Sequence, residues 1–225
     1  MVGDRRLILG NKNYSSWSLR AWLCLRKCSI EFDEIVLPLD TPEFKARIVE
    51  LSPSGRVPVL WHKGLAVWDS LAICEYANDA FADGRLWPED ISSRGLGRSM
   101  VAEMHSGFTH LRNKMPMNCR VVNRHVSVDA DLQGDIDRVC VLWSLALADH
   151  AQIGPWLLGE FSITDAMFAP VVMRFRNYGV VVPDAVKAYC EHVLADADMQ
   201  CWVEEALKET WVVAADEAGS EPPGG

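Results

Sequence analysis

The sequence SPSGRVPVL at residues 52–60, followed by WDSLAI at residues 68–73, decides the fold of this chain. It predicts a loop, a short apolar strand, a turn, a second short strand and a helix that begins at Ser70. Proline has no backbone N–H, so Pro58 can leave the backbone of Val57 facing outward at the strand entry. The polar groups of Val57 could then pair with an extended ligand, as an added strand pairs with a sheet edge.

The residues on either side of this stretch alternate between strand and helix signals. Short apolar runs predict strands, whereas apolar residues at helical spacing predict helices. Thr41 before Pro42 is a helix start, with proline at the first helical position. The expected strands cover residues 7–10, 32–37, 57–61 and 65–67, and the expected helices cover residues 17–27, 42–51 and 70–79. This βαβαββα order, with a right-handed crossover between its first two strands, is the thioredoxin-like plan.

Strand signals fade from about residue 92 onward, and long helical segments dominate. The expected helices cover residues 92–115, 129–150, 163–178, 184–195 and 199–210. We therefore expect a thioredoxin-like α/β domain at residues 1–81, a linker containing Gly84 and Pro88 at residues 82–91, and an all-helical domain at residues 92–215. Residues 216–225 are expected to form a flexible tail.

The composition narrows the class of partner. The chain has 225 residues and a formal net charge of -9 at pH 7, and its Lys and Arg residues are scattered, which argues against nucleic-acid binding. No stretch approaches the roughly 18 apolar residues of a membrane span, and no export signal is visible. Seven cysteines without a CxxC pair or clustered histidines favour a reduced, cytoplasmic setting and no bound metal.

With these motifs in place, the chain resembles the cytosolic glutathione transferases over residues 6–210. Residues 52–60 resemble the Asn-Pro-x-Gly-x-Val-Pro-x-Leu segment of that family, and residues 69–73 resemble its glutamyl-binding signature. Ser162 and Asp165 resemble the capping box of its second domain, where we expect Asp165→Ala to cost about 1 kcal/mol of stability with little loss of catalysis. The resemblance implies a homodimer that uses glutathione as co-substrate.

Residues 14–20, YSSWSLR, narrow the class further. They resemble the Ser-Ser-Cys-x-x-Arg opening of the zeta class, which includes maleylacetoacetate isomerases, and more loosely the serine-type theta and delta classes. Trp17 stands where zeta enzymes have cysteine, and the residues after Arg20 also differ. The sequence therefore favours a bacterial zeta-like or unassigned serine-type group.

In such an enzyme a hydroxyl group stabilises the thiolate of glutathione. A free thiol is only about 3% ionised at pH 7, and lowering its pKa by two units requires roughly 2.7 kcal/mol of preferential anion stabilisation. The start of a helix and a serine hydroxyl could supply it. Alignment on the zeta motif selects Ser15, which we favour, whereas counting back from Arg20 as in theta enzymes selects Ser16; Tyr14 is a third candidate donor.

The remaining contacts to glutathione follow from the same resemblance. Ser70 would hold the γ-glutamyl carboxylate at a helix N-terminus, and Asp69 would hold the ammonium group. The backbone at Val57-Pro58 would pair with the peptide. Arg56 would reach the glycyl carboxylate, with Lys45 as a weaker candidate for the same contact.

A second substrate needs its own pocket. Four residues spaced i, i+3, i+4 and i+7 would share one face of the helix expected at residues 92–115, unless that face only packs against a neighbouring helix. Together with two aromatic residues near the thiol, the expected pocket comprises Tyr14, Trp17, His105, Phe108, Thr109 and Arg112. This mixture would suit an apolar electrophile that carries a carboxylate.

Three functions remain open on this basis. The first is a glutathione transferase that conjugates a small electrophile, a detoxification reaction. The second is glutathione-dependent cis-trans isomerisation of a maleyl-type diacid. The third is a transferase-like module that binds ligands without catalysis.

Overall fold

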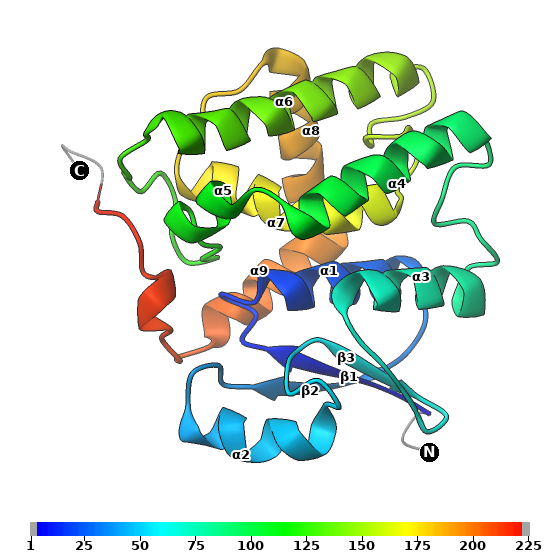
Figure 1. The fold of residues 1–225 in the computed structure, drawn as a ribbon, viewed down its shortest axis with the longest axis vertical. Helices are drawn as coiled ribbons and strands as arrows, with labels where there is room; N and C mark the ends of the chain where they lie inside the picture. Colours follow the sequence, from blue (N-terminus) through cyan, green and yellow to red (C-terminus); the bar gives the residue numbers. More distant parts are fainter. Residues whose placement is uncertain (1–3, 222–225) are drawn as a thin grey trace.

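The computed structural model describes residues 4–221, and β1 (Arg5–Gly10) lies inside its four-stranded sheet (Figure 1). The strand order is β2-β1-β3-β4: β1 pairs in parallel with β2 (Asp33–Leu37) and antiparallel with β3 (Val59–His62), and β3 forms a hairpin with β4 (Leu65–Val67). The expected crossover and hairpin are therefore both present.

The two faces of the sheet are covered by different helices. Leu7 and Leu9 point into the large core beneath α1 (Ser16–Lys27) and α3 (Ser70–Phe81), while Ile8 between them joins a smaller cluster with Ile48 of α2. This alternation is the period of two that a strand imposes on its side chains. Helix α2 (Pro42–Leu51) begins as expected, with the Thr41 hydroxyl accepting a hydrogen bond from the Phe44 N–H. The thioredoxin-like plan is confirmed.

The rest of the chain is helical. Its elements are α4 (Ile91–Ser106), α5 (Thr109–Lys114), α6 (Ala130–His150), α7 (Ile163–Asn177), α8 (Asp184–Ala195), α9 (Ala197–Lys208) and the short 3-10 helix η1 (Ala214–Asp216). Helix α7 is buried over almost its whole length, and α1 packs against both α3 and α7. Side chains of α7 therefore reach the start of α1.

The single helix expected over residues 92–115 is wrong, because the chain breaks after Ser106. Gly107 is extended, and Phe108 adopts left-handed dihedrals with φ 58° while burying its ring in the core. The new helix start is stabilised from outside, since the Asp135 carboxylate on α6 accepts a hydrogen bond from the Leu111 N–H at 2.9 Å. His105 therefore does not share one helical face with residues 108, 109 and 112.

The capping box at the start of α7 is present. The Ser162 side chain caps the helix, and the Asp165 carboxylate accepts hydrogen bonds from the Ser162 N–H and hydroxyl. It also accepts from the Leu157 N–H at 3.1 Å and the Tyr189 hydroxyl at 3.1 Å. Burial raises the pKa of Asp165 to about 6. This carboxylate therefore joins α7, α8 and the preceding loop.

The segment expected to be a flexible tail makes specific contacts where it is described. Glu217, just after η1, accepts hydrogen bonds from the Tyr14 hydroxyl at 2.6 Å and from Asn118, and pairs with Arg124 at 3.1 Å. Residues 222–225 of that segment lie outside the described residues. In residues 4–221 no helix combines the length and apolar composition needed to cross a membrane.

Candidate functional site

Two adjoining cavities lie beside the start of α1. The smaller has a volume of about 430 Å³ and lies against the start of α3. The larger, of about 570 Å³, extends from the start of α1 toward α5 and η1. Trp17, Arg56 and Val57 line both cavities, so a single extended ligand could occupy the boundary between them.

The smaller cavity contains a buried hydroxyl without a partner. Ser70 is fully buried as the first residue of α3, and its Oγ has no hydrogen-bond partner among residues 4–221. A buried polar atom without a partner costs free energy, so a ligand group that contacts it gains affinity. Free N–H groups at a helix start favour an anion. The position predicted for a carboxylate therefore has the matching chemistry.

Asp69 precedes Ser70 and is held from two sides. One carboxylate oxygen accepts hydrogen bonds from the N–H groups of Leu71 and Ala72, and the other lies 2.8 Å from His105 Nε2 on α4. The side chain is still about half exposed and lines the smaller cavity. Asp69 therefore keeps access to a ligand while its orientation is set by α3 and α4.

The wall opposite α3 is formed by the segment before β3. The Val57-Pro58 peptide bond is cis, and neither the N–H nor the C=O of Val57 has a hydrogen-bond partner among residues 4–221. These two backbone groups are thus available to an extended ligand, as the sequence predicts. Arg56 is exposed and lines both cavities, whereas Lys45 is exposed on α2 and lines neither.

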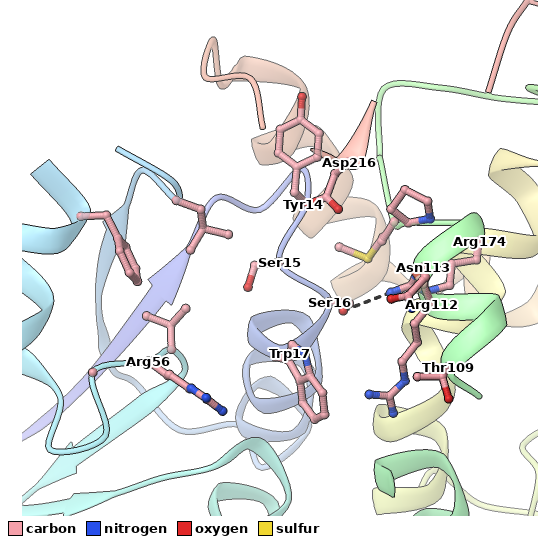
Figure 2. A pocket seen from close by; sticks show the side chains of 16 residues that line it. Tyr14, Ser15, Ser16, Trp17, Arg56, Thr109, Arg112, Asn113, Arg174 and Asp216 are labelled. Atoms are coloured by element: carbon pink, nitrogen blue, oxygen red, sulfur yellow. Dashed lines mark hydrogen bonds between the residues drawn. The ribbon is translucent and has the colours of Figure 1, made fainter. Parts of the chain in front are cut away.

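Three residues that carry a hydroxyl group line the larger cavity near the start of α1, and their hydroxyl groups have different partners (Figure 2). The Tyr14 hydroxyl donates to Glu217, and burial together with that carboxylate raises the pKa of the phenol. The Ser15 hydroxyl donates to Ser18 Oγ at 2.7 Å. The Ser16 Oγ accepts a hydrogen bond from Arg174 Nη2 at 3.3 Å. Of these three hydroxyl groups, that of Ser16 alone donates to no other group among residues 4–221.

Two arginine side chains lie close to the Trp17 ring. The guanidinium carbons of Arg20 and Arg112 lie 4.4 and 4.8 Å from the Trp17 ring centroid, within cation–π range. The rings of His105 and Trp17 form a T-shaped pair with 5.3 Å between their centroids. Arg20 is buried, and burial together with Arg112 and Arg174 lowers its pKa to about 9. Two nitrogens of Arg20 and one of Arg112 lack hydrogen-bond partners in residues 4–221. The region therefore favours an anion.

The expected second-substrate pocket is assembled only in part. Tyr14, Trp17, Thr109 and Arg112 line the larger cavity. Phe108 is instead buried at the break between α4 and α5, and His105 contacts Asp69 and Trp17 without being part of either cavity lining. The break between α4 and α5 separates residues that a continuous helix would have aligned.

Several lining residues were not predicted from the sequence. They come from segments far apart in the chain, and the set comprises Leu39, Phe44, Asn113, Pro116, Met117, Arg174 and Asp216. Arg174 had a partial signal, since it is the charged residue that directly follows the apolar residues 166–173 of α7. Such a residue is rarely buried without a partner or a function. Residues 4–221 contain no group of three or more His, Cys, Asp or Glu side chains that could hold a metal ion.

Comparison with known families agrees with this geometry. Residues 14–80 match the family model described as the N-terminal domain of glutathione S-transferase. This matched segment contains the cis proline, Ser70 and the start of α1. It also contains every residue that the thioredoxin-like part contributes to the lining of the two cavities.

Individual proteins extend the similarity over more of the chain. Glutathione S-transferase L1 of Arabidopsis thaliana is 24% identical over 197 residues, covering 84% of this chain and 73% of that protein. A probable maleylacetoacetate isomerase of Caenorhabditis elegans is 31% identical over 98 residues, covering 44% of this chain and 45% of that protein. The theta class enzyme of Xanthomonas axonopodis pv. citri, solved with glutathione bound, superposes with a TM-score of 0.64 at 23% identity, covering 89% of this chain and 97% of that one.

Proposed function

We propose that this chain is a glutathione transferase, which binds glutathione across the smaller cavity and presents the thiol at the start of α1. The match of residues 14–80 to the N-terminal domain of glutathione S-transferase supports this assignment. The observation that carries this assignment is the unpartnered Ser70 hydroxyl, which faces the same cavity as the unpaired backbone groups of Val57. An ionised carboxylate and an extended peptide backbone satisfy both. Glutathione offers these two groups in one molecule.

In this arrangement each part of the tripeptide has a residue to contact. The γ-glutamyl carboxylate binds Ser70 and the N-terminus of α3, and the ammonium group binds Asp69. The cysteinyl backbone pairs with Val57. The glycyl carboxylate binds Arg56, whose side chain lies at the boundary of the two cavities.

The thiol then lies beside the first turn of α1. The thiolate, not the thiol, is the nucleophile, so the enzyme must favour the ionised form. The positive end of α1 and a serine hydroxyl supply the stabilisation. Of the two serines, Ser16 is the better donor here, because the proton of Ser15 is already donated to Ser18.

The larger cavity receives the second substrate. Its lining combines Trp17 with the cations Arg112 and Arg174, which suits an apolar electrophile carrying a negative group. We place the chain in a zeta-like or unassigned serine-type group on the strength of Ser15 and Ser16. Homodimer formation and a cytoplasmic location belong to the same proposal.

Isomerisation of a maleyl-type diacid is the second candidate. It is supported by residues 14–20 and by the similarity to the Caenorhabditis elegans protein over 98 residues. Thiolate addition to the double bond, rotation and elimination of the same thiolate would return glutathione unchanged. The two reactions need the same activated thiol.

A two-stage assay tests the proposal. Retention on immobilised glutathione with elution by free glutathione establishes binding, and turnover of chlorodinitrobenzene and of maleylacetoacetate then separates conjugation from isomerisation. Retention without turnover of either compound would favour a non-catalytic binding module. A chain that is not retained, and shows no turnover at any glutathione concentration, would refute the proposal.

A further inference from the structure

We propose that Arg174 is a positioning residue for thiol activation, which holds the Ser16 hydroxyl so that its proton points at the glutathione sulfur. The inference rests on the proposed glutathione transferase function and assigns a residue on α7, outside the thioredoxin-like part, to the thiol site. It also selects Ser16 over Ser15. Figure 2 shows the contact between the two side chains as a dashed line.

The first argument is the direction of the hydrogen bond. A guanidinium group is only a donor, so the contact of 3.3 Å between Arg174 Nη2 and Ser16 Oγ obliges the serine oxygen to accept. The serine proton is then free to rotate toward another acceptor. A sulfur atom placed in the larger cavity, which both residues line, would be such an acceptor.

The second argument is the contrast with Ser15. Its hydroxyl donates to Ser18 Oγ at 2.7 Å, and Ser18 Oγ also accepts from the Gly10 N–H at 3.0 Å. Ser15 is moreover the N-cap of α1. Turning its proton toward a ligand would break a buried hydrogen bond, whereas Ser16 can donate without losing one.

The third argument is the rigidity of Arg174. The side chain is 6% exposed, and Nη1 donates to the backbone carbonyl groups of Arg112 and Met115. Two carbonyl groups and one hydroxyl thus fix the plane of the guanidinium. A group fixed in this way acts on the thiolate without reorganising during the reaction.

The charges around Arg174 have the sign that favours a thiolate. Arg20 and Arg112 are its cationic neighbours. The acidic groups near Arg174 are the carboxyl group of Asp216 in η1 and the phenol of Tyr178 at the end of α7. Burial and Arg112 lower the pKa of Arg174 to about 10, which leaves it charged near neutral pH. On ionisation the thiol proton leaves to solvent water, the electron pair of the S–H bond stays on sulfur, and the Ser16 O–H donates to it.

The test begins with the variants Arg174→Gln, Arg174→Lys and Ser16→Ala of the full-length chain. The pKa of bound glutathione is followed by the ultraviolet absorbance of the thiolate, and kcat/KM for chlorodinitrobenzene is measured against pH. We expect Arg174→Gln to raise the thiol pKa by about one unit, since the Ser16 hydroxyl is no longer held toward the sulfur and its hydrogen bond to the thiolate weakens. The pH profile should move equally, while the KM for glutathione changes less than about threefold.

Arg174→Lys keeps a buried cation that can donate to Ser16 and should recover part of the shift. It also supplies the measurement if Arg174→Gln does not fold. Arg176→Gln is the matched control, because Arg176 is on the same helix but donates to the Cys119 carbonyl and lines neither cavity. A purely structural contribution would lower the folded fraction without moving the thiol pKa.

The double variant Ser16→Ala with Arg174→Gln should shift the pKa no further than Ser16→Ala alone, because Arg174 acts through that hydroxyl. An unshifted thiol pKa in both Arg174 variants, or a shift produced by Ser15→Ala but not by Ser16→Ala, would overturn the inference while wild-type turnover left the proposed function standing. Failure of the wild-type chain to bind glutathione would instead remove the proposed function itself.

Discussion

His105 on α4 lies 2.8 Å from the carboxylate of Asp69 at the start of α3, and this contact connects the helical part of the chain to the smaller cavity. The same imidazole forms a T-shaped pair with the Trp17 ring, with 5.3 Å between the ring centroids. His105 was expected to contact the second substrate. In the structure it instead orients a residue that we assign to the ammonium group of glutathione.

Replacing His105 by alanine should therefore weaken glutathione binding rather than the chemical step. We expect the KM for glutathione to rise about three- to tenfold, which corresponds to the loss of one hydrogen bond, with kcat changed by less than about twofold. His110→Ala is the control, because His110 is exposed and lies 4.0 Å from Asp131. Equal effects of the two variants would contradict this assignment of His105.

Ser70→Ala separates binding from stability. Because Ser70 Oγ has no hydrogen-bond partner among residues 4–221, its removal should cost no folding free energy. It should weaken glutathione binding about tenfold or more, since a hydrogen bond to a carboxylate contributes roughly 1.5–3 kcal/mol. Calorimetric titration and thermal unfolding measure the two quantities. Ser99→Ala, on the exposed side of α4, should change neither.

The two serines of α1 should give different results. Ser16→Ala should lower kcat/KM at pH 7 on the order of 20-fold, which is the change in thiolate fraction if the thiol pKa returns from about 6.5 to about 8.5. Ser15→Ala should cost about 1 kcal/mol of stability through loss of the N-cap and leave the pH profile in place. The reverse pattern would restore the assignment that the sequence favours.

Asp165 gives the chain a stability that depends on pH. Burial raises its pKa to about 6, above the unfolded value of about 3.9, so the folded state binds more protons between pH 4 and 6. The free energy of unfolding contributed by this group should therefore fall as pH rises through that window, by on the order of 2–3 kcal/mol. Urea titrations from pH 4 to pH 7 measure it, and Asp165→Asn should abolish the slope. A slope that persists in the variant would assign it to another group.

Asp165→Ala should also cost more than the 1 kcal/mol or so expected from a helix cap alone. The Asp165 carboxylate accepts four hydrogen bonds, including those from the Leu157 N–H and the Tyr189 hydroxyl. Both of these donors lose that acceptor in the variant. We expect about 2–4 kcal/mol at pH 7, with activity per folded molecule nearly unchanged. A loss of activity larger than the loss of folded protein would contradict a structural assignment.

The sequence predicted the features that depend on neighbouring residues. The apolar strand at residues 7–10, the Thr41 cap and the capping box at Ser162 are all local patterns, and the structure contains each of them. The helix starts near Ser15 and Ser70 follow the same rule. The side chains that belong to those starts could therefore be named before the fold was known.

Features set by distant residues could not be predicted in this way. The break at Phe108 depends on Asp135, more than twenty residues further along the chain, which stabilises the new helix start. The contact between Ser16 and Arg174 depends on the packing of α7 against α1. No local pattern encodes either contact.

One measurement tests the central claim, that the chain binds glutathione and lowers the pKa of its thiol. Ultraviolet difference titration of the wild-type chain with glutathione, against S-methylglutathione as a control that has no thiol to ionise, reports the thiolate directly. The account predicts a saturable thiolate signal, and the pKa of the bound thiol should lie about two units below the free value of about 8.5. A bound thiol that titrates at the free value would contradict it.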